Sequence, residues 1–154
     1  MNKKQFEKQE LPHHVAIIPD GNRRWAKQKG LPKIEGHRTA GNKIMDDLVF
    51  HCLDLGIDYV TFWVFSTENW KRGKKFANAL FKLLENELLK GYEKYDKAGI
   101  RLNTIGDLSQ LPKSLRSKLQ EWEEESKNNQ NLTVTIAINY GGRDEIIRAI
   151  GDLG

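Results

Sequence analysis

The residues that decide the fold are His14-Val15-Ala16-Ile17-Ile18-Pro19-Asp20-Gly21-Asn22-Arg23-Arg24-Trp25. The run from His14 to Ile18 is short and apolar and stops at Pro19, which is typical of a buried strand. A carboxylate, a glycine, an asparagine and two arginines follow it directly. The stretch therefore predicts a strand that ends in a loop rich in ligand-binding residue types.

Beyond this stretch, strand-like and helix-like segments alternate along the chain. Apolar residues at helical spacing predict helices over 39–55, 74–98 and 112–122, and a last helix from about Arg143. β-Branched and aromatic residues predict further strands over 58–65, 100–105 and 132–138. Such alternation predicts an α/β fold, a single domain with a mainly parallel sheet and helices on both faces. We expect residues 1–12 to be a polar N-terminal tail and residues 13–154 to be the domain.

The composition is that of a globular protein that does not span a membrane. Of the 154 residues, 38% are hydrophobic and 30% are charged. The longest nearly apolar stretch, Tyr59 to Phe65, is far shorter than the roughly 20 residues that span a bilayer. Residues 1–14 lack the apolar core of a secretory signal. The single cysteine, Cys52, excludes an internal disulfide and suits a reducing compartment, so we expect a cytoplasmic location.

The net charge and the absence of several known motifs limit the ligands that this protein can be expected to bind. The net charge of +4 favours anionic partners weakly and leaves phosphate esters, nucleic acid and an anionic lipid surface open. The sequence has neither the Gly-x-x-x-x-Gly-Lys-Ser/Thr nor the Gly-x-Gly-x-x-Gly motif. Its four histidines lack metal-cluster spacing, and one cysteine cannot supply a cysteine-based zinc site. The common nucleotide-binding loops and zinc sites are therefore excluded.

Four strand-to-helix loops hold most of the chemically reactive residues. In a parallel sheet such loops emerge at the same edge, where ligands bind. They concentrate arginine, tryptophan, asparagine, glycine and acids, and they comprise residues 20–25, 66–72, 106–107 and 139–143. We therefore expect the functional site at this edge.

The first of these loops suits a diphosphate, and the second supplies hydrogen-bonding groups over residues 66–69 and the cations Lys71 and Arg72. Backbone N–H groups at Gly21 and the guanidinium forks of Arg23 and Arg24 bind phosphate oxygens, and the carboxylate of Asp20 can hold Mg²⁺ against them. His37 is placed to meet an anion at the start of a helix. Taken singly, however, each loop is equally compatible with a polar surface turn.

Four ordered motifs resemble those of the cis-prenyltransferases, the undecaprenyl diphosphate synthase-like isoprenyl transferases. They are residues 14–26, Gly36-His37, Phe65-Ser66-Thr67-Glu68-Asn69-Trp70-Lys71-Arg72 and Asn139-Tyr140-Gly141-Gly142-Arg143. The Asp-Asp-x-x-Asp motifs that mark the trans-prenyltransferases are absent. The resemblance implies condensation of isopentenyl diphosphate with an allylic diphosphate such as farnesyl diphosphate, with release of pyrophosphate.

The same resemblance implies roles for individual residues. Asp20 and Asn69 would be catalytic, Asp20 as the ligand of the Mg²⁺ cofactor and Asn69 as the proton acceptor. The other matched positions would bind substrate, namely Gly21, Asn22, Arg23, Arg24, Trp25, Lys33, His37, Ser66, Thr67, Glu68, Trp70 and Arg72. An apolar channel for the growing tail is expected between helices 39–55 and 74–98 and strand 59–65.

The resemblance also implies which partners the protein has. We expect a homodimer in the full-length form and peripheral contact with a membrane. A nucleic acid partner is not expected, because the positive residues lie beside acids rather than in a stripe. The alternative to an enzyme is a non-catalytic interaction subunit that pairs with a full-length synthase.

The sequence departs from the family pattern in three respects. Arg23 stands where many bacterial members have glycine. Lys33 stands where arginine is frequent, and Gly73 replaces the usual proline. Family members also continue past Arg143 into a segment that grips isopentenyl diphosphate and a glutamate that contributes to Mg²⁺ binding. We therefore expect a chain that lacks the C-terminal segment of the family, binds the allylic substrate and turns over slowly or not at all.

Overall fold

The computed structural model describes residues 11–151 and, apart from residues 87–90, their side chains. Most of the predicted N-terminal tail, residues 1–10, lies outside the described residues. The strands are β1 (His14–Ile17), β2 (Tyr59–Ser66), β3 (Ile100–Ile105) and β4 (Leu132–Tyr140). The α-helices are α1 (Asn22–Gln28), α2 (Lys33–Thr39), α3 (Met45–Leu55), α4 (Lys74–Lys97), α5 (Lys113–Glu125) and α6 (Gly142–Gly151). Shorter turns are the π-helical η2 (Ala40–Ile44) and the 3₁₀-helical η3 (Thr67–Arg72) and η4 (Leu108–Gln110).

The four strands form one parallel sheet in the order β1-β2-β4-β3. Val60 is in register with Val134, and Phe62 with Ile136, so apolar side chains of neighbouring strands share one face. Parallel strands need crossover helices between them, which the alternation of the sequence supplies. The prediction of an α/β fold with a mainly parallel sheet is confirmed.

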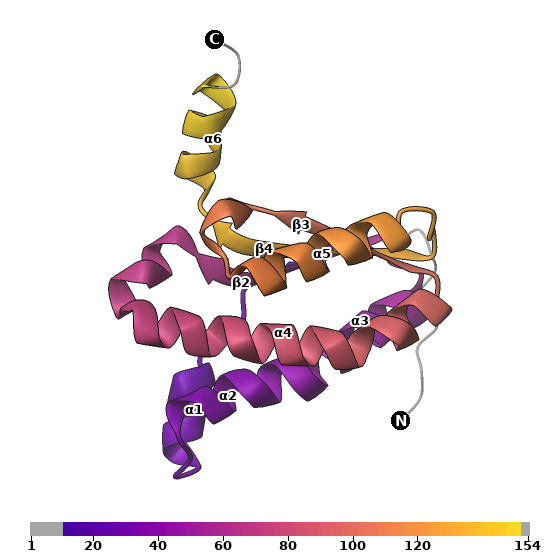
Figure 1. The fold of residues 1–154 in the computed structure, drawn as a ribbon. Coiled ribbons are helices and arrows are strands. Elements are labelled where there is room, and N and C mark those ends of the chain that lie inside the picture. Colours follow the sequence, from indigo (N-terminus) through magenta and orange to yellow (C-terminus); the bar gives the residue numbers. More distant parts are fainter. Residues whose placement is uncertain (1–10, 152–154) are drawn as a thin grey trace.

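The main core lies on one face of this sheet, where α3, α4 and α5 pack (Figure 1). Val60, Phe62, Val134 and Ile136 are almost fully buried there. The alternate residues on the other face, such as Thr61, are only half-buried in the described part of the chain. Within residues 11–151, helices therefore bury one face of the sheet more completely than the other. The sequence accounts for this difference, because apolar residues alternate with threonines along these strands, whereas a strand buried on both faces is apolar throughout.

The β3 edge of the sheet is covered by α5. The backbone N–H of Leu102 donates to Ser126 Oγ at 2.9 Å, and the backbone N–H of Thr104 donates to Glu123 Oε1. Edge strands present unpaired backbone groups of this kind. The side chains of Glu123 in α5 and of Ser126, the residue that caps this helix, therefore take the place of a neighbouring strand at this edge.

Three parts of the chain differ from the sequence prediction. The polar stretch after β1 contains two short helices, α1 and α2, of which α1 buries only Ala26 and so has no apolar periodicity to reveal it. The helix predicted over 39–55 is interrupted by η2, and segment 67–72 is a 3₁₀ helix rather than a loop. None of the helices within residues 11–151 combines the length and apolar composition that crossing a bilayer requires.

Candidate active site

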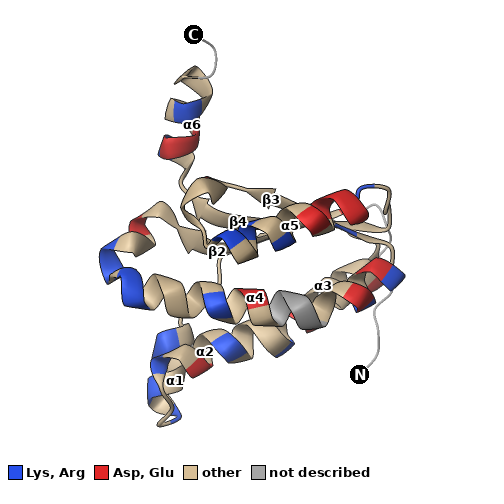
Figure 2. Ribbon diagram, in the orientation of Figure 1, with Lys and Arg blue, Asp and Glu red and all other residues tan. Residues whose placement is uncertain are grey.

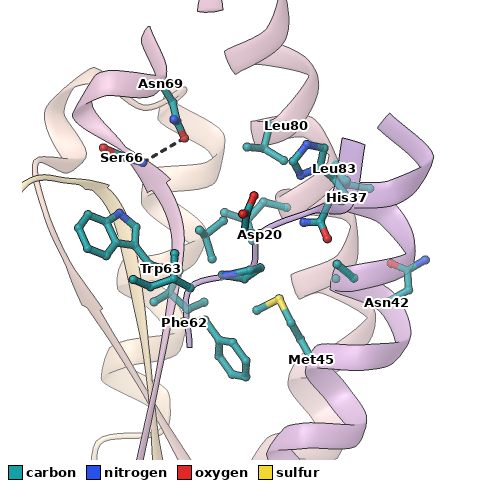
Figure 3. A pocket seen from close by; sticks show the side chains of 18 of the residues that line it. Asp20, His37, Asn42, Met45, Phe62, Trp63, Ser66, Asn69, Leu80 and Leu83 are labelled. Atoms are coloured by element: carbon teal, nitrogen blue, oxygen red, sulfur yellow. Dashed lines mark hydrogen bonds between the residues drawn. The ribbon is translucent and has the colours of Figure 1, made fainter. Parts of the chain in front are cut away.

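A large cavity lies between the sheet and helices α2 to α4. Its volume is about 1070 Å³, at the upper end of the range for small-ligand pockets. Its polar end, called the mouth below, lies at the carboxyl ends of β1 and β2, near Asp20 and Ser66 (Figure 3). Its walls are apolar and include Phe62, Leu80 and Leu83. The edge of the sheet predicted from the sequence therefore opens into an apolar chamber.

Asp20 stands at the mouth, three residues after β1. Its carboxylate accepts hydrogen bonds from the Gly21 backbone N–H at 2.6 Å and from Arg24 Nη2 at 3.0 Å. The Asp20 side chain is 85% exposed. Gly21 has a φ of +83°, a left-handed conformation that glycine adopts without strain, and it begins α1. The turn therefore fixes a solvent-facing carboxylate beside a guanidinium group.

A close approach of α1 and α2 builds the second side of the mouth. A Cβ atom at Gly36 would lie 1.9 Å from the backbone oxygen of Asn22 and 3.3 Å from Ala26 Cβ. Only glycine permits two helices to approach this closely. Because His37 follows Gly36 directly, this contact brings its imidazole close to the first turn of α1.

Arginines from two separate segments act on His37 through their charge. Burial lowers the pKa of its imidazole, and Arg72 from η3 and Arg23 from α1 lower this pKa further. Its ring packs edge-on against Phe76, with 5.8 Å between the centroids, and Arg72 Cζ lies 5.4 Å from the same Phe76 centroid. His37 Nε2 is buried and has no hydrogen-bond partner among the described residues. A buried nitrogen without a hydrogen-bond partner, near enough to two arginines to feel their charge, suits an anionic ligand.

Segment 66–72 is fixed by a capping box at the end of β2. Ser66 Oγ accepts a hydrogen bond from the Glu68 backbone N–H at 3.2 Å, and Asn69 Oδ1 accepts one from the Ser66 backbone N–H at 3.3 Å. Figure 3 shows the Asn69 side chain directed back to Ser66 at this end of the strand. The capping box therefore determines where Asn69 lies. Its predicted role as proton acceptor stays a prediction.

Asn139, which the sequence analysis did not single out, connects three of the four loops. It is 1% exposed and has a φ of +49°. Its Oδ1 accepts a hydrogen bond from Trp70 Nε1 at 2.8 Å, and its Nδ2 donates to the Asp107 carbonyl at 2.8 Å. The sequence gives one indication that Asn139 is important: it is a polar residue at the end of an apolar strand, and it belongs to the last of the four motifs. Asn139 thus joins η3 and the loop after β3 to the end of β4.

Most of the predicted site residues line the cavity, namely Asp20, Gly21, Asn22, Arg23, Arg24, Lys33, His37, Ser66, Glu68, Asn69 and Arg72. Trp25, Thr67 and Trp70 do not. Trp25 is 38% exposed on α1. Thr67 lies against Gly141, and Trp70 packs on Phe65 and Phe81. The structure therefore brings the charged part of the prediction together and places these three side chains outside the cavity wall.

The donor set at the mouth fits Mg²⁺ bound together with a substrate. Asp20 offers an exposed carboxylate there, and no group of three or more metal-binding side chains occurs within the described ranges. Mg²⁺ is usually held by one or two carboxylates together with substrate phosphates and water. A single carboxylate beside an anion site has this chemistry, whereas an all-protein metal cage does not occur at the mouth.

Positive charge gathers around the mouth on several elements. Figure 2 shows Lys and Arg on α1, on α2 and at the start of α4, which lie at the same end of the molecule. Lys27 and Lys33 line the cavity with the arginines already described. Such a concentration of one sign of charge attracts anionic ligands.

Comparison with known proteins agrees with this geometry. Residues 18–153 match the family model described as "Putative undecaprenyl diphosphate synthase". The isoprenyl transferase of Clostridium tetani is 47% identical over 97% of this chain and 58% of its own length, and that of Aquifex aeolicus is 46% identical over 91% and 60%. This chain therefore spans about 60% of the length of these curated relatives.

Two solved structures share the fold. Lavandulyl diphosphate synthase from Lavandula x intermedia, solved in complex with dimethylallyl diphosphate, matches with a TM-score of 0.87 and 33% identity over 92% of this chain and 61% of that chain. A probable undecaprenyl diphosphate synthase from Campylobacter jejuni matches with a TM-score of 0.72 and 38% identity over 92% and 60%. These names do not favour the alternative of a non-catalytic subunit. The chain belongs to the undecaprenyl diphosphate synthase family of prenyltransferases.

Proposed function

We propose that this chain binds an allylic diphosphate and condenses it with isopentenyl diphosphate, which is cis-prenyl chain elongation. The observation that carries the proposal is an apolar cavity of about 1070 Å³ with a cationic mouth. An allylic diphosphate has the two matching parts, an anionic head and a hydrocarbon tail. The dimethylallyl diphosphate bound to lavandulyl diphosphate synthase supports this substrate class.

The residues at the mouth suit departure of the diphosphate. When the allylic C–O bond breaks, negative charge grows on the leaving group, and fixed cations stabilise that charge. Arg23, Arg24 and Arg72 supply guanidinium groups there, and the apolar walls behind them keep water from the reacting carbon. A Mg²⁺ ion held by Asp20 would add Lewis-acid stabilisation of the same charge.

Formation of the new C–C bond releases one proton from isopentenyl diphosphate. A group must accept that proton, directly or through water. We propose Asn69 for this position, because the capping box holds its carboxamide at the end of β2, in the cavity wall near the mouth. Ser66 and Glu68 line the same wall and would position the substrate.

Further proposals concern assembly and location. The isoleucines of α6 (Ile146, Ile147 and Ile150) are each more than 60% exposed, which supports a homodimer that covers them. The positive charge around the mouth supports peripheral contact with an anionic membrane. The single cysteine, Cys52, supports a cytoplasmic location.

Binding is tested by calorimetric titration of farnesyl diphosphate. Arg24→Ala should weaken binding by about tenfold or more, because a charge-assisted contact with phosphate is lost. Arg101→Ala is the matched control, since Arg101 is exposed on β3 and does not line the cavity. Equal affinities of wild type and Arg24→Ala would contradict the placement of the diphosphate at the mouth.

Turnover is tested by incorporation of labelled isopentenyl diphosphate into extractable lipid. Incorporation should require Mg²⁺, and Asp20→Ala should lower its rate by orders of magnitude because the carboxylate that holds the ion is gone. Asp47→Ala, at an exposed carboxylate outside the cavity lining, is the control. Equal rates with Asp20 present and removed would overturn the proposed mechanism.

A further inference from the structure

Two residues of the family motifs, Trp70 and Asn139, lie outside the cavity wall and contact each other. The resemblance implies that Trp70 binds substrate, but its ring packs on Phe65 and Phe81 instead. Asn139 is 1% exposed and does not line the cavity either. Trp70 Nε1 donates a hydrogen bond to Asn139 Oδ1 at 2.8 Å. The proposed function has so far given this pair no role.

The geometry of η3 explains why its side chains point to different places. In a 3₁₀ helix, side chains three residues apart lie on the same face. Asn69 and Arg72 have this spacing, and both line the cavity. Trp70 is turned by about 120° from Asn69, since such a helix has about three residues per turn, and it packs against Phe81 in the core. The same short helix therefore carries two proposed site residues on one face and a core residue on another.

The hydrogen bond to Asn139 fixes the position of η3 relative to the sheet. The capping box joins Ser66 to Asn69 within one segment, so it determines the shape of η3 rather than its position against β4. The apolar packing of the Trp70 ring restrains η3 with little directionality. The hydrogen bond from Trp70, in contrast, is directional and reaches a residue 69 positions further along the chain. It therefore restrains the rotation of η3.

Asn139 is itself held firmly at the end of β4. Its Nδ2 donates to the Asp107 carbonyl at 2.8 Å, and the Asp107 backbone N–H donates to the Asn139 carbonyl at 3.2 Å. A Cβ atom at Gly106 would lie 2.1 Å from a backbone oxygen of β4. A Cβ atom at Gly141 would lie 2.6 Å from Thr67 Oγ1, at the start of η3. The end of β4 is thus packed closely against both loops.

We propose that Asn139 is a positioning residue, which acts through Trp70 to orient η3 so that Asn69 and Arg72 face the cavity, an inference that rests on the proposed function. An asparagine amide offers an acceptor and a donor at once, and here Trp70 uses the first and Asp107 the second. Asparagine also adopts the left-handed region, with a φ of +49° here, more readily than most side chains. The position therefore suits asparagine in both side chain and backbone.

Two variants remove the link between Asn139 and Trp70 in different ways. Trp70→Phe removes the indole N–H and keeps an aromatic ring in the core. Asn139→Gly removes the amide, and glycine accepts the φ of +49° without strain. Leu119→Val is the matched control, because Leu119 is fully buried in α5 and does not line the cavity. It lowers stability through lost packing and leaves η3 unchanged. Urea unfolding establishes that each variant is folded.

The position of Arg72 can be measured without substrate. The charge of Arg72 lowers the pKa of the His37 imidazole, and an NMR titration of this ring reports that effect. Both link variants should raise the pKa of His37 towards 6.5, in the same direction as Arg72→Ala. Arg23, the other cation that lowers this pKa, belongs to α1 and stays in place. The control variant should keep the wild-type value.

Calorimetric titration of farnesyl diphosphate tests the proposed function separately. Both link variants should bind it about threefold more weakly or worse, because a charged contact with phosphate is lost, and the control should bind it as wild type does. If both link variants are folded and keep the wild-type affinity and the wild-type pKa of His37, Asn139 does not position η3.

The remaining outcomes separate the two proposals. Equal changes in Leu119→Val would assign the effects to a general loss of stability and would also overturn the role of Asn139. If wild type does not bind farnesyl diphosphate but the link variants raise the pKa of His37, the proposed function fails while the orientation of η3 by Asn139 is supported.

Discussion

The imidazole of His37 is partly buried and feels the positive charge of two arginines. Burial, Arg72 and Arg23 all lower its pKa from 6.5. Between that lowered value and 6.5 the unfolded chain therefore binds more protons than the folded chain. The contribution of His37 to stability is complete above pH 6.5 and is lost as the pH falls through 6.5 towards the lowered pKa.

We predict that His37→Gln makes the stability less dependent on pH in this window. Thermal unfolding of both forms, measured between about pH 7.5 and about pH 5.5, should show a smaller loss for the variant. His51→Gln, at an exposed position of α3, should behave as wild type. A loss of the same size in His37→Gln and wild type would show that His37 remains a simple solvent-exposed imidazole.

The buried amide of Asn139 has a structural role that can be measured. Asn139→Ala leaves Trp70 Nε1 and the Asp107 carbonyl without their partner, and it puts alanine at a φ of +49°. We expect the free energy of unfolding to fall by about 2 kcal/mol or more, since two groups lose their partner and each costs about 1–3 kcal/mol. Urea unfolding measures this change. Asn103→Ala, at a half-buried asparagine of β3, should cost much less, and equal costs would contradict the role of Asn139.

The residues at the mouth could be predicted because their chemistry is local in sequence. Asp20, Arg23 and Arg24 stand together after a strand, and the topology of parallel sheets places such a loop at the functional edge. Asn139 could not be predicted in the same way. Its partner Trp70 is 69 residues away, and no local pattern contains that pairing.

Among the elements, the contact between α1 and α2 determines the shape of the mouth. Gly36→Ala would force a Cβ atom against the backbone oxygen of Asn22, at 1.9 Å. We expect a destabilisation of about 1–3 kcal/mol from overpacking and a weaker affinity for farnesyl diphosphate as α1 moves away. Calorimetry and urea unfolding measure the two effects. Gly142→Ala meets nothing within 4 Å, so a similar effect there would contradict this explanation.

The elements that could be predicted are those with a strong apolar period. β3 and α4 match the sequence prediction to within a residue at each end, because their apolar residues repeat clearly. The helix α1 has one fully buried side chain, Ala26, and gives no such signal. The π-helical turn η2 joins α2 to α3 beside the cavity. Its form is set by how these two helices pack, and the local sequence does not specify that packing.

At the scale of the whole molecule, the sheet gathers separate loops into one cationic mouth, and the helices enclose an apolar chamber behind it. Asp20 follows β1, Ser66 ends β2, and Asn139 lies near the end of β4, so one edge of a parallel sheet supplies all three. Helices α2 to α4 supply most of the chamber wall. The proposed substrate would place its anionic head at the mouth and its hydrocarbon tail in the chamber of the same cavity.

The most direct test of this account is a crystal structure of the chain with Mg²⁺ and a non-hydrolysable farnesyl diphosphate analogue. The diphosphate should lie at the mouth, in contact with Arg23, Arg24 or Arg72 and next to His37, with Mg²⁺ on Asp20. The tail should run past Leu80 and Leu83 towards Tyr95. A diphosphate bound elsewhere on the protein, or a tail outside the cavity, would contradict the central claim.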